Sequence, residues 1–221
     1  MFVLEPGTGL TGKLKTARKG VGVYRVTAHG KAAHAGVDFS AGASAILELA
    51  AQLPRVASFT NPDRGITVNP GVISGGTRSN VVAAEATVEV DVRVPRLRDA
   101  AALDRRFHKL RPVDGRCTLD VSGGLNRPPM ERSRGTVELY RLAKHAAREI
   151  GIDLPESATG GGSDGNFTAA LGVPTLDGLG AVGEGAHAPH ESILIDRIAD
   201  RVAILAALLA GASPAKAVRK E

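Results

Sequence analysis

Aromatic residues and cysteine are scarce in this chain of 221 residues. Only 3% of the residues are Phe, Trp or Tyr, and Trp is absent. The cores must therefore be built from Val, Leu, Ile and Ala, and aromatic platforms for stacking nucleic-acid bases are scarce as well. The single Cys117 excludes an internal disulfide and a metal cluster built from thiolates. We interpret it as a small residue of a strand.

Long apolar runs and clustered positive charge are also lacking. No run of about 18 apolar residues is present to span a membrane, and the first residues have neither the basic start nor the apolar length of a signal peptide. These features predict a cytoplasmic chain with no membrane partner. The formal net charge of +5 is spread over the sequence rather than gathered into a patch, which argues against a nucleic-acid partner.

The middle of the chain alternates between strand and helix patterns. The run from Ala84 to Val94 keeps apolar residues on one face and polar residues on the other, as expected for a strand with one buried face. The whole series is expected as strand 21–29, helix 38–53 ended by Pro54, strand 65–73, strand 83–94, helix 97–110 and strand 116–121. This βαββαβ order predicts a ferredoxin-like domain with two helices on one face of an antiparallel sheet.

The flanking parts of the chain show a different pattern. We expect a first strand from Met1, a helix over 136–150, a helical stretch to 171, a strand over 173–176 and a helix over 193–209. Strands that alternate with helices favour a parallel α/β layer. Two or three strands are few for such a layer, which predicts that part of this domain is missing.

His34 stands among small residues in the segment Gly30-Lys31-Ala32-Ala33-His34-Ala35-Gly36, between an expected strand and an expected helix. Small neighbours leave the imidazole free to project from a connection where functional residues tend to lie. A turn histidine held by local hydrogen bonds is the alternative.

Two further segments carry candidate metal ligands. Glu5 ends the first expected strand, and a carboxylate at that edge of an α/β sheet is well placed for a ligand site. His187 lies in a glycine-rich loop, and an imidazole with a carboxylate suits Zn²⁺. His190 is a rival ligand, and an ordinary surface carboxylate and loop histidine are the alternatives.

Four other residues are candidates for substrate binding. The amide of Asn80 can donate to a developing oxyanion, and the guanidinium groups of Arg93 and Arg127 can hold a carboxylate in a bidentate fork. A solvated sheet face and a linker charge are the alternatives for the two arginines. The turn around Gly162 lacks the ending of a phosphate-binding loop, so we interpret it as a close backbone approach to a ligand.

Taken in order, these motifs resemble the zinc-dependent exopeptidases and amidohydrolases that include glutamate carboxypeptidase, acetylornithine deacetylase and succinyl-diaminopimelate desuccinylase. The matching segments are Leu4-Glu5-Pro6, 30–36, Ser79-Asn80-Val81-Val82, Asp91-Val92-Arg93, Arg127-Pro128, 159–164 and Gly185-Ala186-His187. Each segment is short, but the ordered set covers nearly the whole chain.

The resemblance implies an organisation and a set of roles. Residues 1–19 and 131–221 would form a partial α/β catalytic domain, and residues 20–130 an inserted lid that makes a homodimer. Glu5 and His187 would be ligands of a two-zinc site, and His34 would reach the partner's active site to polarise the scissile carbonyl. The substrate's carboxylate and oxyanion would be held by Asn80, Arg93 and Arg127, with a backbone contact from Gly162.

The chain departs from that family in one respect. It contains no His-X-Asp motif and no Glu-Glu pair, which in the family supply metal ligands and the general base. The resemblance therefore implies a C-terminal part, from a truncated reading frame or a split enzyme whose N-terminal half is encoded separately. We expect a hydrolase of amide bonds acting on small acidic peptides or N-acyl amino acids, inactive alone. The alternative is a non-catalytic dimerisation or interaction remnant.

Overall fold

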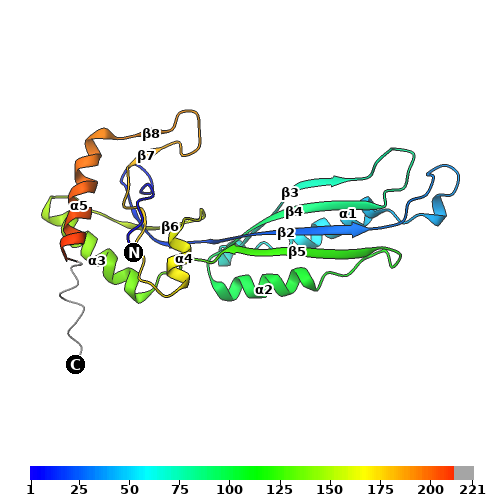
Figure 1. Ribbon diagram of the computed structural model, residues 1–221, viewed down its shortest axis with the longest axis horizontal. Helices are drawn as coiled ribbons and strands as arrows, with labels where there is room; N and C mark the ends of the chain where they lie inside the picture. The colour runs from blue at the N-terminus through cyan, green and yellow to red at the C-terminus, as the bar shows by residue number, and fades with distance from the viewer. Residues whose placement is uncertain (212–221) are drawn as a thin grey trace, which may run out of the picture. The chain divides into compact units, whose positions relative to one another are not determined.

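The computed structural model describes residues 1–211, which form two compact units. Of the described residues, 1–19 and 129–211 belong to unit 1, and 20–128 form unit 2. Among the described residues, no helix is long and apolar enough to cross a membrane. Figure 1 labels the helices α1–α5 and the strands β2–β8.

Unit 2 is built on a four-stranded antiparallel sheet. Its strands are β2 (Gly20–His29), β3 (Thr67–Gly75), β4 (Glu85–Val94) and β5 (Thr118–Arg127), in the spatial order β3-β4-β2-β5 (Figure 1). In β4 every second residue from Ala86 to Val94 is buried, as the alternating sequence predicts. The order of elements confirms the predicted βαββαβ arrangement.

Two helices bury one face of this sheet. They are α1 (Ala45–Ala57) and α2 (Leu97–His108), and their apolar residues share one core with the strands. The rings of Phe107 on α2 and Tyr24 on β2 stack with centroids 4.0 Å apart. The opposite face of the sheet carries polar and charged side chains, so unit 2 has one packed face and one open face.

The expected helix over 38–53 is wrong at both ends. Phe39–Ala41 form only a 3-10 turn (η1), because Ala43 next exchanges two backbone hydrogen bonds with Lys31 and cannot be helical. Helix α1 then begins after Ser44, whose hydroxyl accepts from Leu47 N. Pro54 does not end the helix but lies inside its last turn.

Unit 1 has shorter strands, arranged in two separate pairs. β1 (Leu14–Arg18) pairs in parallel with β6 (Glu156–Thr159), and β7 (Gly183–Glu184) pairs with β8 (Ser192–Ile193) in a small hairpin (Figure 1). The helices are α3 (Arg134–Glu149), α4 (Gly165–Ala170) and α5 (Ile198–Gly211), and the remaining short turns are η2 (Pro62–Arg64, in unit 2) and η3 (Ile195–Arg197). The parallel pair with flanking helices fits the predicted mixed α/β class.

The expected strands at Met1 and over 173–176 are wrong, because neither segment forms a regular strand. They form a single parallel bridge, between Phe2 and Leu176. Backbone bonds nevertheless continue along both segments, from Val3 N to Leu176 O and from Gly180 N to Glu5 O. The two segments therefore run side by side and end together, which sets the position of Glu5.

Candidate functional site

A cavity of about 520 Å³ lies in unit 1, at the ends of these neighbouring segments. Five segments line it: 5–9, residues 15 and 18 of β1, the glycine-rich turn at 159–162, the loop 181–187, and residues 191–193. Glu5, Gly162 and His187 all line this cavity, so the structure brings together three of the residues singled out from the sequence.

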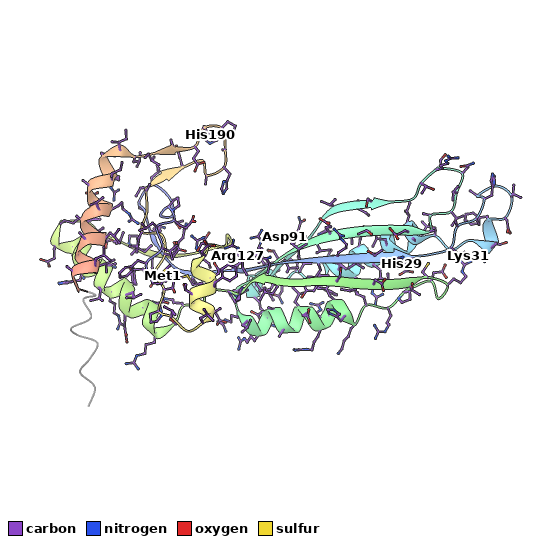
Figure 2. All side chains as sticks on the ribbon, viewed as in Figure 1. Met1, His29, Lys31, Asp91, Arg127 and His190 are labelled. Carbon is purple, nitrogen blue, oxygen red and sulfur yellow. The ribbon has the colours of Figure 1, made fainter. Side chains whose placement is uncertain are left out.

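His187 and its rival His190 differ in backbone conformation and in position relative to the cavity. His187 has a φ of 66°, a left-handed conformation that is uncommon for a residue other than glycine, and its N–H donates to Glu191 Oε2 at 3.2 Å. Strained backbone of this kind clusters at functional sites. His190 lies in the loop between β7 and β8 (Figure 2), packs against Gly185, and is not among the described residues that line the cavity.

A buried ionic network supports the cavity. Arg18 Nε and Nη2 donate to the two carboxylate oxygens of Asp177 at 2.6 and 3.0 Å, and Arg18 Nη1 donates to Gly161 O at 3.0 Å. Ser163 Oγ donates to Asp177 Oδ2 at 2.6 Å. Because both charged partners are almost fully buried, this network holds the glycine-rich turn against β1.

Lys15 contributes a second positive charge to the cavity wall. Its side chain is only 9% exposed, and its Nζ donates to Pro6 O at 2.7 Å. Burial lowers the pKa of Lys15, and the neighbouring charge of Arg18 lowers it further.

The described residues do not fit a complete metal centre. Glu5 and His187 offer a carboxylate and an imidazole in one cavity. Among residues 1–211, however, no group of three or more His, Cys, Asp or Glu side chains is placed to hold a metal ion. Protein zinc sites use at least three protein ligands.

His34 and Asn80 lie on two loops of unit 2 that pair with each other. His34 bridges to Val81, and Ala35 N donates to Asn80 O at 2.9 Å. Both side chains are exposed, although His34 Nδ1 accepts a hydrogen bond from Gly36 N at 3.2 Å. The local hydrogen bond expected for an ordinary turn histidine is therefore present, and the ring remains accessible.

Arg93 and Arg127 occupy one row of the sheet. Both residues pair with Val21, Arg93 from β4 on one side and Arg127 from β5 on the other. Arg93 Nε and Nη2 donate to Asp91 at 2.8 and 2.9 Å, so its guanidinium already holds a carboxylate. A ligand carboxylate at Arg93 must share the guanidinium with Asp91 or displace it.

The loops of His34 and Asn80 lie at one end of the sheet of unit 2, and Arg93 and Arg127 lie at the other. Val21 stands at the start of β2, whereas the loop of His34 follows its last residue, His29. Figure 2 shows Asp91 and Arg127 at one end and His29 and Lys31 at the other. One copy of unit 2 cannot bring His34 and Arg93 onto the same small ligand, because the eight steps from Val21 to His29 span roughly 26 Å at about 3.3 Å per residue.

Sequence reasoning missed the network beneath the cavity. Arg18 and Asp177 are far apart in the sequence, and nothing local signals that they meet. A signal did exist for the partner of Arg93, because Asp91 lies two positions earlier on the same face of a predicted strand.

The chain combines two kinds of unit: a mixed α/β unit with a carboxylate, an imidazole and a glycine-rich turn around one cavity, and a ferredoxin-like unit inserted into its sequence. Residues 16–112 match the family model of the peptidase dimerisation domain. This model describes the dimerisation domain of the M20 peptidases, and the similarity to the known proteins below extends over most of the chain.

Carboxypeptidase G2 of Pseudomonas sp. (strain RS-16) is 29% identical over 211 residues, which cover 93% of this chain and 50% of the relative. The uncharacterized protein YqjE of Bacillus subtilis is 27% identical, over 91% of this chain and 54% of the relative. The chain thus spans about half the length of these relatives.

Solved structures show the same fold. The aminopeptidase PepT of Bacillus cereus matches with a TM-score of 0.76 and 26% identity, over 94% of this chain and 55% of that structure. A tripeptidase of Staphylococcus aureus matches with a TM-score of 0.78 and 21% identity, over 94% of this chain and 55% of that structure.

Proposed function

We propose that this chain supplies the dimerisation domain and part of the active site of a metal-dependent amide-bond hydrolase of the carboxypeptidase type. The observation that carries the proposal is the meeting of Glu5, Gly162 and His187 in one cavity of a chain that also carries the peptidase dimerisation domain. Three segments distant in the sequence converge there. The relationship to carboxypeptidase G2 supports this reaction class.

In this proposal the residues have distinct roles. Glu5 and His187 are two members of a larger zinc ligand set, and Gly162 offers backbone to the substrate. Arg93 and Arg127 hold the terminal carboxylate of an acidic peptide or N-acyl amino acid, as two guanidinium groups in one row of a sheet are suited to do. Asn80 and His34 polarise the scissile carbonyl and stabilise the oxyanion.

The separation of His34 and Asn80 from Arg93 and Arg127 supports a homodimer. Because His34 and Arg93 lie at opposite ends of the sheet, a site that uses both needs two copies of unit 2. The edge strand β3 is available for pairing, since β4 is its only neighbour within the sheet of the described chain. Ile73 on this strand is 59% exposed, and Ile46 on helix α1, which contacts β3, is 45% exposed. We propose that this edge pairs with its symmetry mate.

The chain by itself is proposed to be inactive. No group of three metal-ligating side chains is present in residues 1–211, and two ligands bind zinc weakly. The remaining ligands and the general base would come from another polypeptide segment, such as a separately encoded N-terminal half.

The direct test is an assay of the purified chain with Zn²⁺ against a panel of N-acyl glutamates. The chain is assayed alone and after mixing with a separately expressed N-terminal half of a related carboxypeptidase. We expect no turnover by the chain alone and metal-dependent turnover after mixing. Metal-dependent turnover by the chain alone would contradict the proposed inactivity.

Variants test the assignment of the ligands. His187→Ala should abolish turnover of the mixture, whereas His190→Ala, its matched control outside the cavity wall, should retain it. Equal loss in both variants would show that the loop, and not the imidazole of His187, is what the reaction needs.

A non-catalytic dimerisation module is the second candidate. It is favoured by the missing ligand group in the described residues together with the match to the dimerisation domain. A chain that dimerises but gives no turnover with any complementing half would support this candidate instead.

A further inference from the structure

Lys15 is a nearly buried cation in the wall of the unit 1 cavity, and the roles proposed above do not use it. It lies on β1 with 9% of its surface exposed. Of the three N–H groups of its ammonium, one donates to Pro6 O at 2.7 Å, and no other hydrogen bond from Nζ to the described residues is present.

The carboxylates around Lys15 do not form an ion pair with it. The buried carboxylate of Asp177 is held by Arg18 and Ser163. No carboxylate of the described residues forms an ion pair with Lys15, and Asp177 and Glu5 act on it only as charges at longer range. A buried charge without a paired partner is costly, and proteins rarely keep one without a use.

The surroundings of Lys15 leave room for a ligand. The cavity of about 520 Å³ is lined by Lys15 together with Gly161 and Gly162. A Cβ added at Gly161 would meet no atom within 4 Å, so the surface there is open. The cavity therefore has space for a small anion.

We propose that Lys15 forms a subsite for a carboxylate group of the ligand, beside the glycine-rich turn. The subsite rests on the proposed function, because it supplies a place for a second carboxylate of an acidic substrate. A carboxylate is favoured over a phosphate for two reasons. The site offers one ammonium, since Arg18 is occupied by Asp177, and the carboxylates of Glu5, Glu184 and Glu191 in the same cavity repel a phosphate group, with its two charges, more than one singly charged carboxylate group of a ligand.

The test measures binding by the full chain and needs no turnover. Glutarate is titrated into the chain, and its dissociation constant is measured by calorimetry for the wild type, Lys15→Met and Lys13→Met. Lys13 is the matched control, because it lies two residues earlier, is exposed and does not line the cavity. Inorganic phosphate is the second ligand.

We expect saturable binding of glutarate that weakens at least about tenfold in Lys15→Met, in keeping with the loss of a charge-assisted hydrogen bond. Binding should be unchanged in Lys13→Met, and phosphate should bind more weakly than glutarate. The denaturation midpoint of Lys15→Met without ligand should equal or exceed that of the wild type, because an unpaired buried charge has been removed; this also shows that the variant folds.

Three results would overturn the subsite: no saturable binding by the wild type, equal binding by Lys15→Met, or tighter binding of phosphate. Its failure is separable from failure of the proposed function. Binding that depends on Lys15 without turnover after mixing leaves the subsite standing and removes the hydrolase. Turnover after mixing, together with glutarate binding that is the same in Lys15→Met as in the wild type, supports the hydrolase and removes the subsite.

Discussion

Arg18 and Asp177, 159 positions apart in the sequence, form a buried ion pair with two hydrogen bonds, Nε to Oδ2 at 2.6 Å and Nη2 to Oδ1 at 3.0 Å. Asp177 is fully buried and Arg18 is 4% exposed. The pair joins β1 to the segment that runs beside Glu5. The walls of the cavity therefore depend on it.

Asp177→Ala should destabilise unit 1 strongly. The substitution leaves the guanidinium of Arg18 buried without a counter-charge and removes the acceptor of Ser163 Oγ. Breaking a buried pair in this way typically lowers the free energy of unfolding by about 3–5 kcal/mol. Chemical denaturation measures the change.

Asp153→Ala is the matched control for that experiment. Asp153 also pairs with a cation, Lys144, but at 3.8 Å and with 80% of its side chain exposed. Exposed pairs contribute about 0–1 kcal/mol, so this variant should unfold nearly as the wild type does. A similar effect of both substitutions would contradict the importance of the buried pair.

Glu48 makes the stability of unit 2 depend on pH. Its carboxylate is 2% exposed and accepts hydrogen bonds from Val113 N, Asp114 N and Gln52 Nε2. Burial alone would raise the pKa of Glu48, but the donors outweigh it and hold the pKa below the ordinary value of 4.5. The ionised form thus stabilises the folded state above that value, and the contribution is lost as the pH falls through the folded pKa.

Glu48→Gln should therefore lower the free energy of unfolding by about 1–3 kcal/mol at neutral pH, because a neutral amide cannot satisfy all three donors. The difference from the wild type should shrink as the pH is lowered below 4.5. Denaturation curves over a pH series measure it, with Glu149→Gln, on the exposed surface of α3, as the control. A difference that stays constant down to low pH would contradict this role of Glu48.

Ile73→Lys should convert the proposed dimer to a monomer. Ile73 is 59% exposed on the edge strand β3, and a charge on an exposed edge opposes strand pairing. Sedimentation velocity at micromolar concentration gives the oligomeric state. Val113→Lys changes a residue of similar exposure, 63%, that lies away from β3, and it should remain dimeric. A wild-type chain that sediments as a monomer would refute the dimer itself.

Much of unit 2 was predictable from the sequence, because its signals are local. The alternation from Ala84 to Val94 identifies β4, and the spacing of apolar residues identifies α2. The start of α1 was not predictable in this way. It depends on the pairing of Ala43 with Lys31, which only the folded chain brings together.

The sequence by itself determined the elements of unit 2 and their order, and the candidates Glu5, His34, Asn80 and His187, since each follows from residues within one short segment. The tertiary structure alone decided which candidates meet. The register across Val21 placed Arg93 and Arg127 in one row, and the parallel run of two distant segments brought Glu5 to the loop of His187. It also buried Lys15 and paired Arg18 with Asp177. These contacts join residues far apart in the chain, so no local pattern of side chains records them.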